Sequence, residues 1–303
     1  MRNSNIQIIN HKELDKVIWD KKICASVSPS FFALSWVLDI LHPNWKALVL
    51  NDYQGFMPIS EAKKYGVAYV FQPKFIRSFS IFHEIESQRV AILDAFKETY
   101  SLVNVNLDFE FKESSGKGIF QKLSIPDSRE LLHNAYSKNA IRIISKLDAE
   151  IEYKLFYDAS AFIQFFKKIK NIKTLKSSSY SKLHQLINET LKRENGKLIA
   201  AFYKGEMIAC GFFIFFQKQV YFMKGTVNKT GREKGAFYGL IDFVLQSLVG
   251  SFDNFDFVGS NDKGIADFYR KFGSQDFSYS ILKYNKIKTP VKQLANLYLQ
   301  IKS

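Results

Sequence analysis

The sequence predicts an α/β protein of the α+β kind, built from two similar units that each form a mixed sheet flanked by helices. One observation is a strand, turn and strand pattern that occurs once in each half of the chain. Another is that both copies are followed by a third strand, a helix and a further strand. A chain of 303 residues also exceeds the usual size of one hydrophobic core, which favours two domains.

The two hairpins share a turn motif. The first reads WKALVLNDYQGFMPI and the second GKLIAAFYKGEMIACGFF, and both turns have the form Tyr-x-Gly-x-Met. Glycine tolerates the positive φ of tight hairpin turns, so Gly55 and Gly205 are expected to hold equivalent turn positions. Alternating α/β chains always look somewhat repetitive, but the shared turn favours a domain duplication.

The later elements follow in matching order. The third strands are AYVFQP and QVYFMK, the helices QRVAILDAFKETYSLV and GAFYGLIDFVLQSLVG, and the strands after them VNVNLDFEF and NFDFVGS. Between the halves, ELLHNAYSKNAIRIISKL predicts one or two helices. We therefore place a domain boundary near residue 148, with an N-terminal unit at 1–148 and a C-terminal unit at 149–303.

The composition predicts a folded protein with anionic partners. Hydrophobic residues make up 47% of the chain, and the net charge is +14. That charge suits nucleic acid, a phospholipid surface or a phosphate-bearing ligand, although dispersed lysines also form ordinary solvated faces. The two distant cysteines and an N-terminus without a signal-peptide pattern predict a cytoplasmic protein. The five histidines form no metal-binding spacing, so no metal site is predicted.

Residues 221–249 (YFMKGTVNKTGREKGAFYGLIDFVLQSLV) contain the clearest candidate binding loop. A strand ends, glycines and cations follow, and an amphipathic helix begins. Backbone N–H groups at a helix N-terminus, with Arg232 and Lys234 nearby, suit a pyrophosphate, and Gly235 would allow its close approach. Such a loop also arises for purely geometric reasons.

The order of elements from this loop onward resembles the GNAT superfamily of acyl-CoA-dependent N-acyltransferases. In that family an Arg/Gln-x-x-Gly-x-Gly/Ala loop cradles the CoA pyrophosphate, and here Phe237 stands in the place of the last small residue. A second family motif, A-x-x-L-Y-x-K-x-G, is matched around Tyr269 by Ala266, Lys271 and Gly273. The resemblance implies acyl-CoA, such as acetyl-CoA, as donor, held by Gly231, Arg232, Lys234, Gly235 and Ala236.

The tandem arrangement resembles the Fem-type aminoacyl or peptidyl transferases of cell-wall assembly, which consist of two GNAT-like units. Their last motif runs roughly F-K-x-x-F-G, and residues 268–273 (FYRKFG) carry Tyr269 in place of the lysine. This resemblance implies aminoacyl-tRNA as an alternative donor. The acceptor would be a small-molecule amine or a cell-envelope precursor amine, with peripheral membrane contact as a further option.

Acyl transfer from a thioester to an amine needs a proton donor for the leaving thiolate. Tyr269 is the candidate, because a tyrosine hydroxyl is protonated at neutral pH. It is expected at the border of the buried face that Phe268 shares, about 100° further round the helix. Asp256 is the candidate base, although a strand Asp can equally bond backbone amides. A backbone N–H at a bulge within Tyr221–Gly225 would stabilise the tetrahedral intermediate.

The first half lacks the glycine and cation loop at its matching helix start, IFHEIESQRVAIL. We therefore expect a degenerate copy that has lost its donor site and helps to form the acceptor groove. Trp45, Gln72 and Arg77 are candidate groove residues, although core packing also explains Trp45 and solvent exposure Arg77. A third reading is a non-catalytic module that binds an anionic glycan or lipid precursor.

Overall fold

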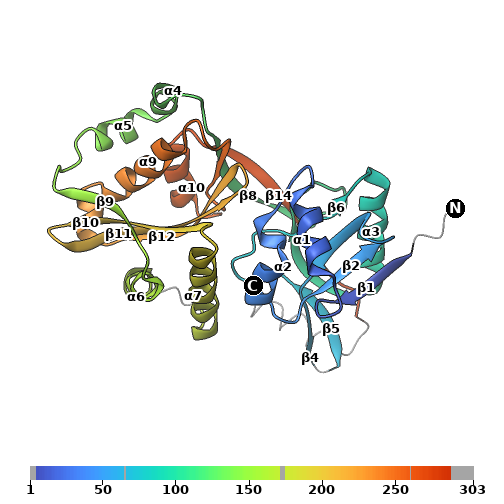
Figure 1. Cartoon of the computed structure of the whole chain (residues 1–303). Coiled ribbons are helices and arrows are strands. Elements are labelled where there is room, and N and C mark those ends of the chain that lie inside the picture. Colours follow the sequence, from blue (N-terminus) through green and yellow to red (C-terminus); the bar gives the residue numbers. More distant parts are fainter. Residues whose placement is uncertain (1–4, 65, 171–174, 260, 288–303) are drawn as a thin grey trace. The chain divides into compact units, whose positions relative to one another are not determined.

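The structure is a computed structural model that describes residues 5–64, 66–170, 175–259 and 261–287 (Figure 1). It divides into two compact units. Unit 1 comprises residues 1–118 and 278–303, and unit 2 comprises residues 119–277. None of the helices in the described ranges is both long enough and apolar enough to cross a bilayer.

Unit 1 contains short helices, a mixed set of strands and one long helix. In chain order they are β1 (Ile6–Asn10), α1 (Lys16–Cys24), η1 (Phe31–Ala33), α2 (Ser35–Leu41), β2 (Lys46–Leu50), β3 (Gly55–Ile59), β4 (Glu61–Lys64), β5 (Val67–Phe71), β6 (Phe82–His83), α3 (Glu86–Thr99) and β7 (Leu102–Leu107). The next strand, β8 (Gly116–Ser124), leads into unit 2.

Unit 2 repeats this plan with longer strands. Its elements are α4 (Arg129–Asn134), α5 (Lys138–Ile144), β9 (Ile151–Phe156), α6 (Ala159–Lys170), α7 (Ser177–Lys192), β10 (Gly196–Tyr203), β11 (Glu206–Phe216), β12 (Gln219–Val227), α8 (Lys229–Glu233), α9 (Ala236–Leu248), β13 (Asn254–Asp256) and α10 (Lys263–Arg270). The last strand, β14 (Gln275–Asn285), leads back into unit 1. Figure 1 shows α9 and α10 on one face of its strands and α6 and α7 on the other.

The two units pair their strands in the same way. In unit 1, β1–β2, β2–β3 and β4–β5 are antiparallel, and β5 runs parallel to β7 across α3. In unit 2, β9–β10, β10–β11 and β11–β12 are antiparallel, and β12 runs parallel to β13 across α9. The main difference is that the long third strand of unit 2, β11, corresponds to two strands, β3 and β4, in unit 1. The predicted fold class of two mixed sheets flanked by helices is confirmed.

The boundary expected near residue 148 differs from the division in the structure. The last strand of each unit comes from the other half of the sequence: β8 pairs with β13 through residues 122–124, and β14 pairs with β7 through residues 280–285. Helices α4 and α5 also belong to unit 2, because Leu132, Tyr136 and Ala140 lie in its hydrophobic core. The units therefore divide within β8 and within β14, at 118/119 and 277/278.

The two hairpin glycines lie at corresponding turns but for different reasons. Gly205 has a φ of +80° and open space around its α-carbon. Gly55 instead begins β3, and the positive φ values of its turn fall on residues 51–53, so the expected positive φ at Gly55 is wrong. A Cβ at Gly55 would lie 2.8 Å from Ile92 Cδ1 and 3.3 Å from Gln88 Cβ. Gly55 is therefore needed for the close approach of α3.

We expect Gly55→Ala and Gly205→Ala to lower the free energy of unfolding by different mechanisms. Gly205→Ala forces alanine into a left-handed conformation, at a cost of about 1–2 kcal/mol. Gly55→Ala overpacks the α3 contact, at about 1–3 kcal/mol, and Ile92→Val should recover part of that loss by removing the clashing Cδ1. Urea unfolding would measure each. Gly116→Ala is the control, since its Cβ would meet only Ile281 Cδ1 at 3.8 Å; a Gly55 variant as stable as this control would contradict the explanation.

Candidate active site

A cavity of about 470 Å³ in unit 2 forms where β12 and β13 diverge. The recorded pairing of these parallel strands ends at Tyr221 and Asp256. The residues that follow, Phe222 to Gly225 and Phe257 to Gly259, line the cavity from its two sides. Diverging strands leave backbone N–H and C=O groups that a ligand can pair with, because these groups must otherwise find other partners.

The bulge predicted within Tyr221–Gly225 is confirmed. On β11, Phe213 pairs with Phe222 while its neighbour Phe212 pairs with Lys224, so Met223 is the extra residue of β12. A bulge of this kind interrupts the hydrogen-bond ladder at the extra residue. Met223 lines the cavity, so the interruption lies at the cavity wall.

The glycine and cation loop forms one end of the cavity. Asn228 caps α8, and its Oδ1 accepts a hydrogen bond from Gly231 N at 2.8 Å. Gly235 precedes α9 with a φ of +68°. Gly231, Arg232 and Gly235 all line the cavity, as the motif predicts. A Cβ at Gly231 would lie 2.5 Å from Ile208 O, so the glycine allows α8 to pack closely on β11.

Two other predicted loop residues lie apart from the cavity lining. Lys234 Nζ is 2.7 Å from Asp148 Oδ2 and 3.9 Å from the ring centroid of Tyr203. The hydrogen bond from Lys234 holds the pKa of Asp148 below its usual range. Ala236 is fully buried in the unit 2 core. Phe237 does line the cavity, where its ring packs against Phe222 at a centroid distance of 6.0 Å.

Tyr269 lines the cavity from α10 but is more deeply buried than expected. Asp262 caps the N-terminus of this helix, Lys271 is its C-cap, and Gly273 lies two residues further on with a φ of +83°. The expected border position of Tyr269 is wrong: the residue is 9% exposed and its ring stacks on Phe257 at 4.3 Å. Burial raises the pKa of its hydroxyl, which is therefore protonated at neutral pH. Within the described chain, no hydrogen bond to that hydroxyl is recorded.

Asp256 lies outside the cavity lining. It is 1% exposed, and its Oδ1 accepts a hydrogen bond of 2.6 Å from Val258 N. Val258 and Gly259 both have positive φ values, +57° and +83°, so the carboxylate supports an unusual turn. This turn places Phe257, Val258 and Gly259 at the cavity wall.

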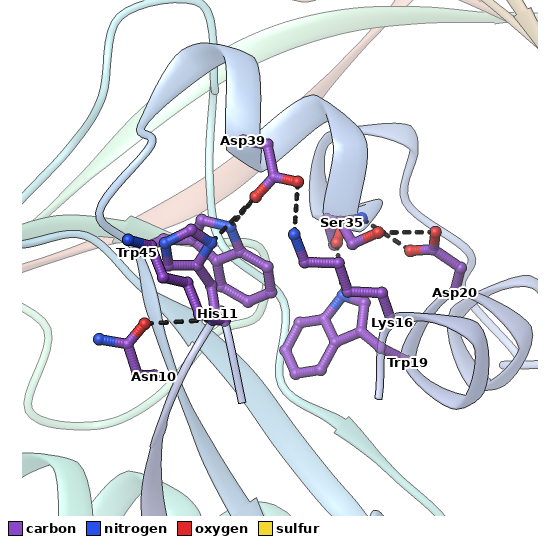
Figure 2. Close-up of polar contacts among 10 residues, drawn as sticks. Asn10, His11, Lys16, Trp19, Asp20, Ser35, Asp39 and Trp45 are labelled. Carbon is purple, nitrogen blue, oxygen red and sulfur yellow. Dashed lines mark hydrogen bonds and ion pairs between the residues drawn. The ribbon is translucent and has the colours of Figure 1, made fainter. Parts of the chain in front are cut away.

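The predicted groove residues of unit 1 have structural partners (Figure 2). Trp45 is 1% exposed, and its Nε1 donates a hydrogen bond of 2.9 Å to Asp39 Oδ1. Gln72 Nε2 donates to Ile76 O at 2.8 Å, and its Oε1 accepts from Asn106 N at 2.9 Å. Asn106 Nδ2 donates to the backbone carbonyl of Arg77 at 2.8 Å. These contacts hold residues 72–77 against β7.

The same contacts close the position in unit 1 that corresponds to the unit 2 cavity. The β5–β7 pairing recorded at Phe71 and Asn104 is followed by the Gln72 bond to Asn106 and by a parallel bridge from Phe79 to Leu107. Phe79 N donates to Asn106 O at 2.8 Å. The chain itself therefore occupies this edge of β7.

Sequence reasoning missed two lysines that line the unit 2 cavity, Lys170 and Lys224. A signal was present in both cases. Lys224 interrupts the apolar strand YFMKG, and Lys170 follows Phe166 by one helical turn, on the same face of α6. Among the described residues, no three His, Cys, Asp or Glu side chains gather where they could hold a metal ion.

Known structures share this fold. FemX has a TM-score of 0.67 at 10% identity, over 98% of this chain and 100% of its own. The C-terminal domain of a proposed lysylphosphatidylglycerol synthetase from Agrobacterium fabrum has a TM-score of 0.56 at 9% identity, over 94% and 96%. A tandem GNAT protein from the clavulanic acid biosynthesis pathway, without AcCoA, has a TM-score of 0.54 at 8% identity, over 91% and 97%.

These likenesses define the class of fold. The chain has the fold of two tandem GNAT-like units, in the arrangement found in FemX and in the tandem GNAT protein. No family model matches the sequence, and no curated protein does either.

Proposed function

We propose that the protein is an N-acyltransferase that moves an acyl group from an acyl-CoA to an amine, with its reaction centre in the unit 2 cavity. The observation that carries this proposal is the cavity itself, which combines a strand gap, a bulge at Met223 and the protonated hydroxyl of Tyr269. Arg232, Gly231 and Gly235 at the loop end would hold the donor's phosphates.

Each part of the site has a step in the reaction. The amine nitrogen attacks the thioester carbonyl, a C–N bond forms, and a backbone N–H at the Met223 bulge stabilises the negative charge on oxygen. The C–S bond then breaks, Tyr269 donates its proton to the leaving thiolate, and the tyrosinate regains a proton from water. The amine proton leaves to water. We assign no step to Asp256, because its carboxylate bonds the backbone of Val258 and does not line the cavity.

Aminoacyl-tRNA is a second candidate donor, favoured by the full-length similarity to FemX and by the net charge of +14. Titration calorimetry with acetyl-CoA and filter binding with bulk tRNA, both at several salt concentrations, would separate the two donors. Phosphate-driven tRNA binding falls steeply as salt rises. We expect heat with acetyl-CoA; tight, salt-sensitive tRNA binding without such heat would replace acyl-CoA by aminoacyl-tRNA.

Arg232→Gln should weaken acetyl-CoA binding roughly tenfold, because it removes a charge-assisted hydrogen bond to phosphate. Lys234→Gln is the matched control: it also removes one positive charge from the loop, but that charge faces Asp148. Calorimetry on both variants would measure the difference. Equal losses in the two variants would contradict the assigned loop geometry. If neither donor binds and anionic glycans raise the melting temperature instead, the protein is a non-catalytic binding module.

A further inference from the structure

Two lysines reach the unit 2 cavity from different elements. Lys170 is the last residue of α6, and Phe166, one turn earlier, lines the same cavity. Lys224 lies on β12 directly after the bulge and is partly buried. Burial lowers the pKa of the Lys224 ammonium, and the charge of Lys170 lowers it further. The two ammonium groups are therefore close enough to repel each other.

The bulge determines the direction of Lys224. The cross-strand partners Phe213 and Phe222 stack at 5.1 Å in the core beneath α9. Phe212, the partner of Lys224, points the other way and meets Phe162 of α6 at 6.3 Å. Cross-strand partners share a face, so Lys224 also faces α6. Regular alternation would have placed it on the face of Phe222, in the aromatic core. The extra residue thus turns a lysine toward Lys170.

The cavity has an excess of positive charge. Its lining includes Lys170, Lys224 and Arg232, and no Asp or Glu is present among the described residues that line it. Arg232 belongs to α8, which packs beside α9, whereas the two lysines lie on the α6 side of the sheet. The cavity therefore has two separate cationic regions, with the Met223 bulge adjoining the lysine pair. Lys170 is exposed and Lys224 is partly buried, and like charges close to each other at the mouth of a cavity favour a bound anion.

We propose that Lys170 and Lys224 bind an acidic group, a carboxylate or a phosphate, on the amine acceptor. This inference rests on the proposed function, in which Arg232 and its loop hold the phosphates of the donor. The lysine pair then lies beside the bulge, where the acyl carbonyl is attacked. The acceptor is an amine that carries an acid group a few bonds from its nitrogen.

The first test uses inorganic phosphate and acetate as probes. Each anion is titrated by calorimetry into the full chain saturated with CoA, because CoA then occupies the Arg232 region. The ionic strength is held constant, so that screening by salt does not vary. We expect binding that weakens roughly tenfold or more in Lys170→Met and Lys224→Met, which keep the side-chain length and remove the charge. Lys168→Met is the control, since Lys168 is exposed on α6 and lies outside the lining.

The second test identifies the source of the acid group. With acetyl-CoA as donor, glycine is compared with glycinamide and phosphoethanolamine with ethanolamine, and the acidic member of at least one pair should have a roughly tenfold higher kcat/KM. The preferred pair shows whether carboxylate or phosphate is recognised. In each of the two lysine variants that preference should be lost, so that the acidic and neutral members of the pair have similar kcat/KM values.

Several results would overturn the inference. These results are no binding of either anion to the wild type, unchanged anion binding in both lysine variants, or equal reactivity of acidic and neutral acceptors. Weaker acetyl-CoA binding in the lysine variants, with acceptor preference unchanged, would assign the pair to the donor instead. Absence of acetyl-CoA binding in the wild type would contradict the proposed donor, and the anion titrations, repeated without CoA, would still decide whether the lysine pair binds an acid group.

Discussion

Tyr269→Phe is expected to lower turnover about a hundredfold or more and to leave the free energy of unfolding nearly unchanged. The variant keeps the ring that stacks on Phe257 at 4.3 Å and removes only the hydroxyl. That hydroxyl is buried without a recorded hydrogen bond from the described chain, so its loss leaves no partner unsatisfied. Steady-state kinetics with any verified amine and a thermal melt would measure the two effects.

Tyr136→Phe is the matched control, because Tyr136 lies in the same core but has a structural bond. Its hydroxyl donates to Asp242 Oδ1 at 3.0 Å. The control should lose about 1 kcal/mol of stability and keep its turnover, which is the reverse of the result expected for Tyr269→Phe. An unchanged rate in the Tyr269 variant would leave α10 as a packed helix with no proton donor.

The pH dependence follows from the raised pKa of Tyr269. A general acid acts in its protonated form, so turnover should not fall through ionisation of this group as pH rises from 7 toward the ordinary tyrosine value of about 10. The pKa of Tyr269 is higher in the folded state than in the unfolded state. The contribution of its protonated hydroxyl to the free energy of unfolding is therefore complete below the unfolded pKa and is lost as pH rises above it. The free energy of unfolding, measured with urea, should therefore fall more in the wild type than in Tyr269→Phe as pH rises above 10.

Local patterns predicted the elements of this fold well. The sequence predicts the α10 helix and a glycine with positive φ shortly after it: α10 ends at Arg270, and Gly273 has a φ of +83°. The domain boundary was not predictable in the same way. It depends on β8 pairing with β13 and β14 with β7, and long-range partners leave no trace in strand periodicity.

The candidate site was predictable only where residue type determines position. Gly231 and Gly235 were predicted from the binding-loop pattern, and the structure shows that close packing at Gly231 and a positive φ at Gly235 require glycine there. Lys234 and Arg232 look equivalent in the sequence. In the structure Lys234 pairs with Asp148, whereas Arg232 lines the cavity, and the sequence does not reveal the position of Asp148. Lys224 was missed because its direction depends on Met223 being the extra residue of the bulge, and the sequence does not reveal which residue of Tyr221–Gly225 is the extra one.

Trp45→Ala is expected to lower the stability of unit 1 by about 3–5 kcal/mol, as for other fully buried large aromatic residues. The indole packs on Trp19 at a centroid distance of 5.1 Å and donates to Asp39, which also accepts from Lys16 Nζ at 2.7 Å and contacts His11 Nδ1 at 3.2 Å (Figure 2). Burial alone would raise the pKa of Asp39, but the hydrogen bonds from Lys16 and Trp45 outweigh it and lower the pKa.

Trp45→Phe separates the ring from its hydrogen bond. It keeps most of the packing and removes one donor to Asp39, so we expect a loss of about 1–3 kcal/mol at pH 7 in urea unfolding. Because the pKa of Asp39 is lowered in the folded state, its contribution is present above the unfolded value of about 4 and is lost as pH falls below it. The Phe variant should therefore differ less from the wild type at pH 3 than at pH 7. Val17→Ala, on the exposed face of α1, is the control. If Trp45→Phe were as stable as the wild type and had a raised KM for the acceptor, Trp45 would instead be an acceptor-groove residue.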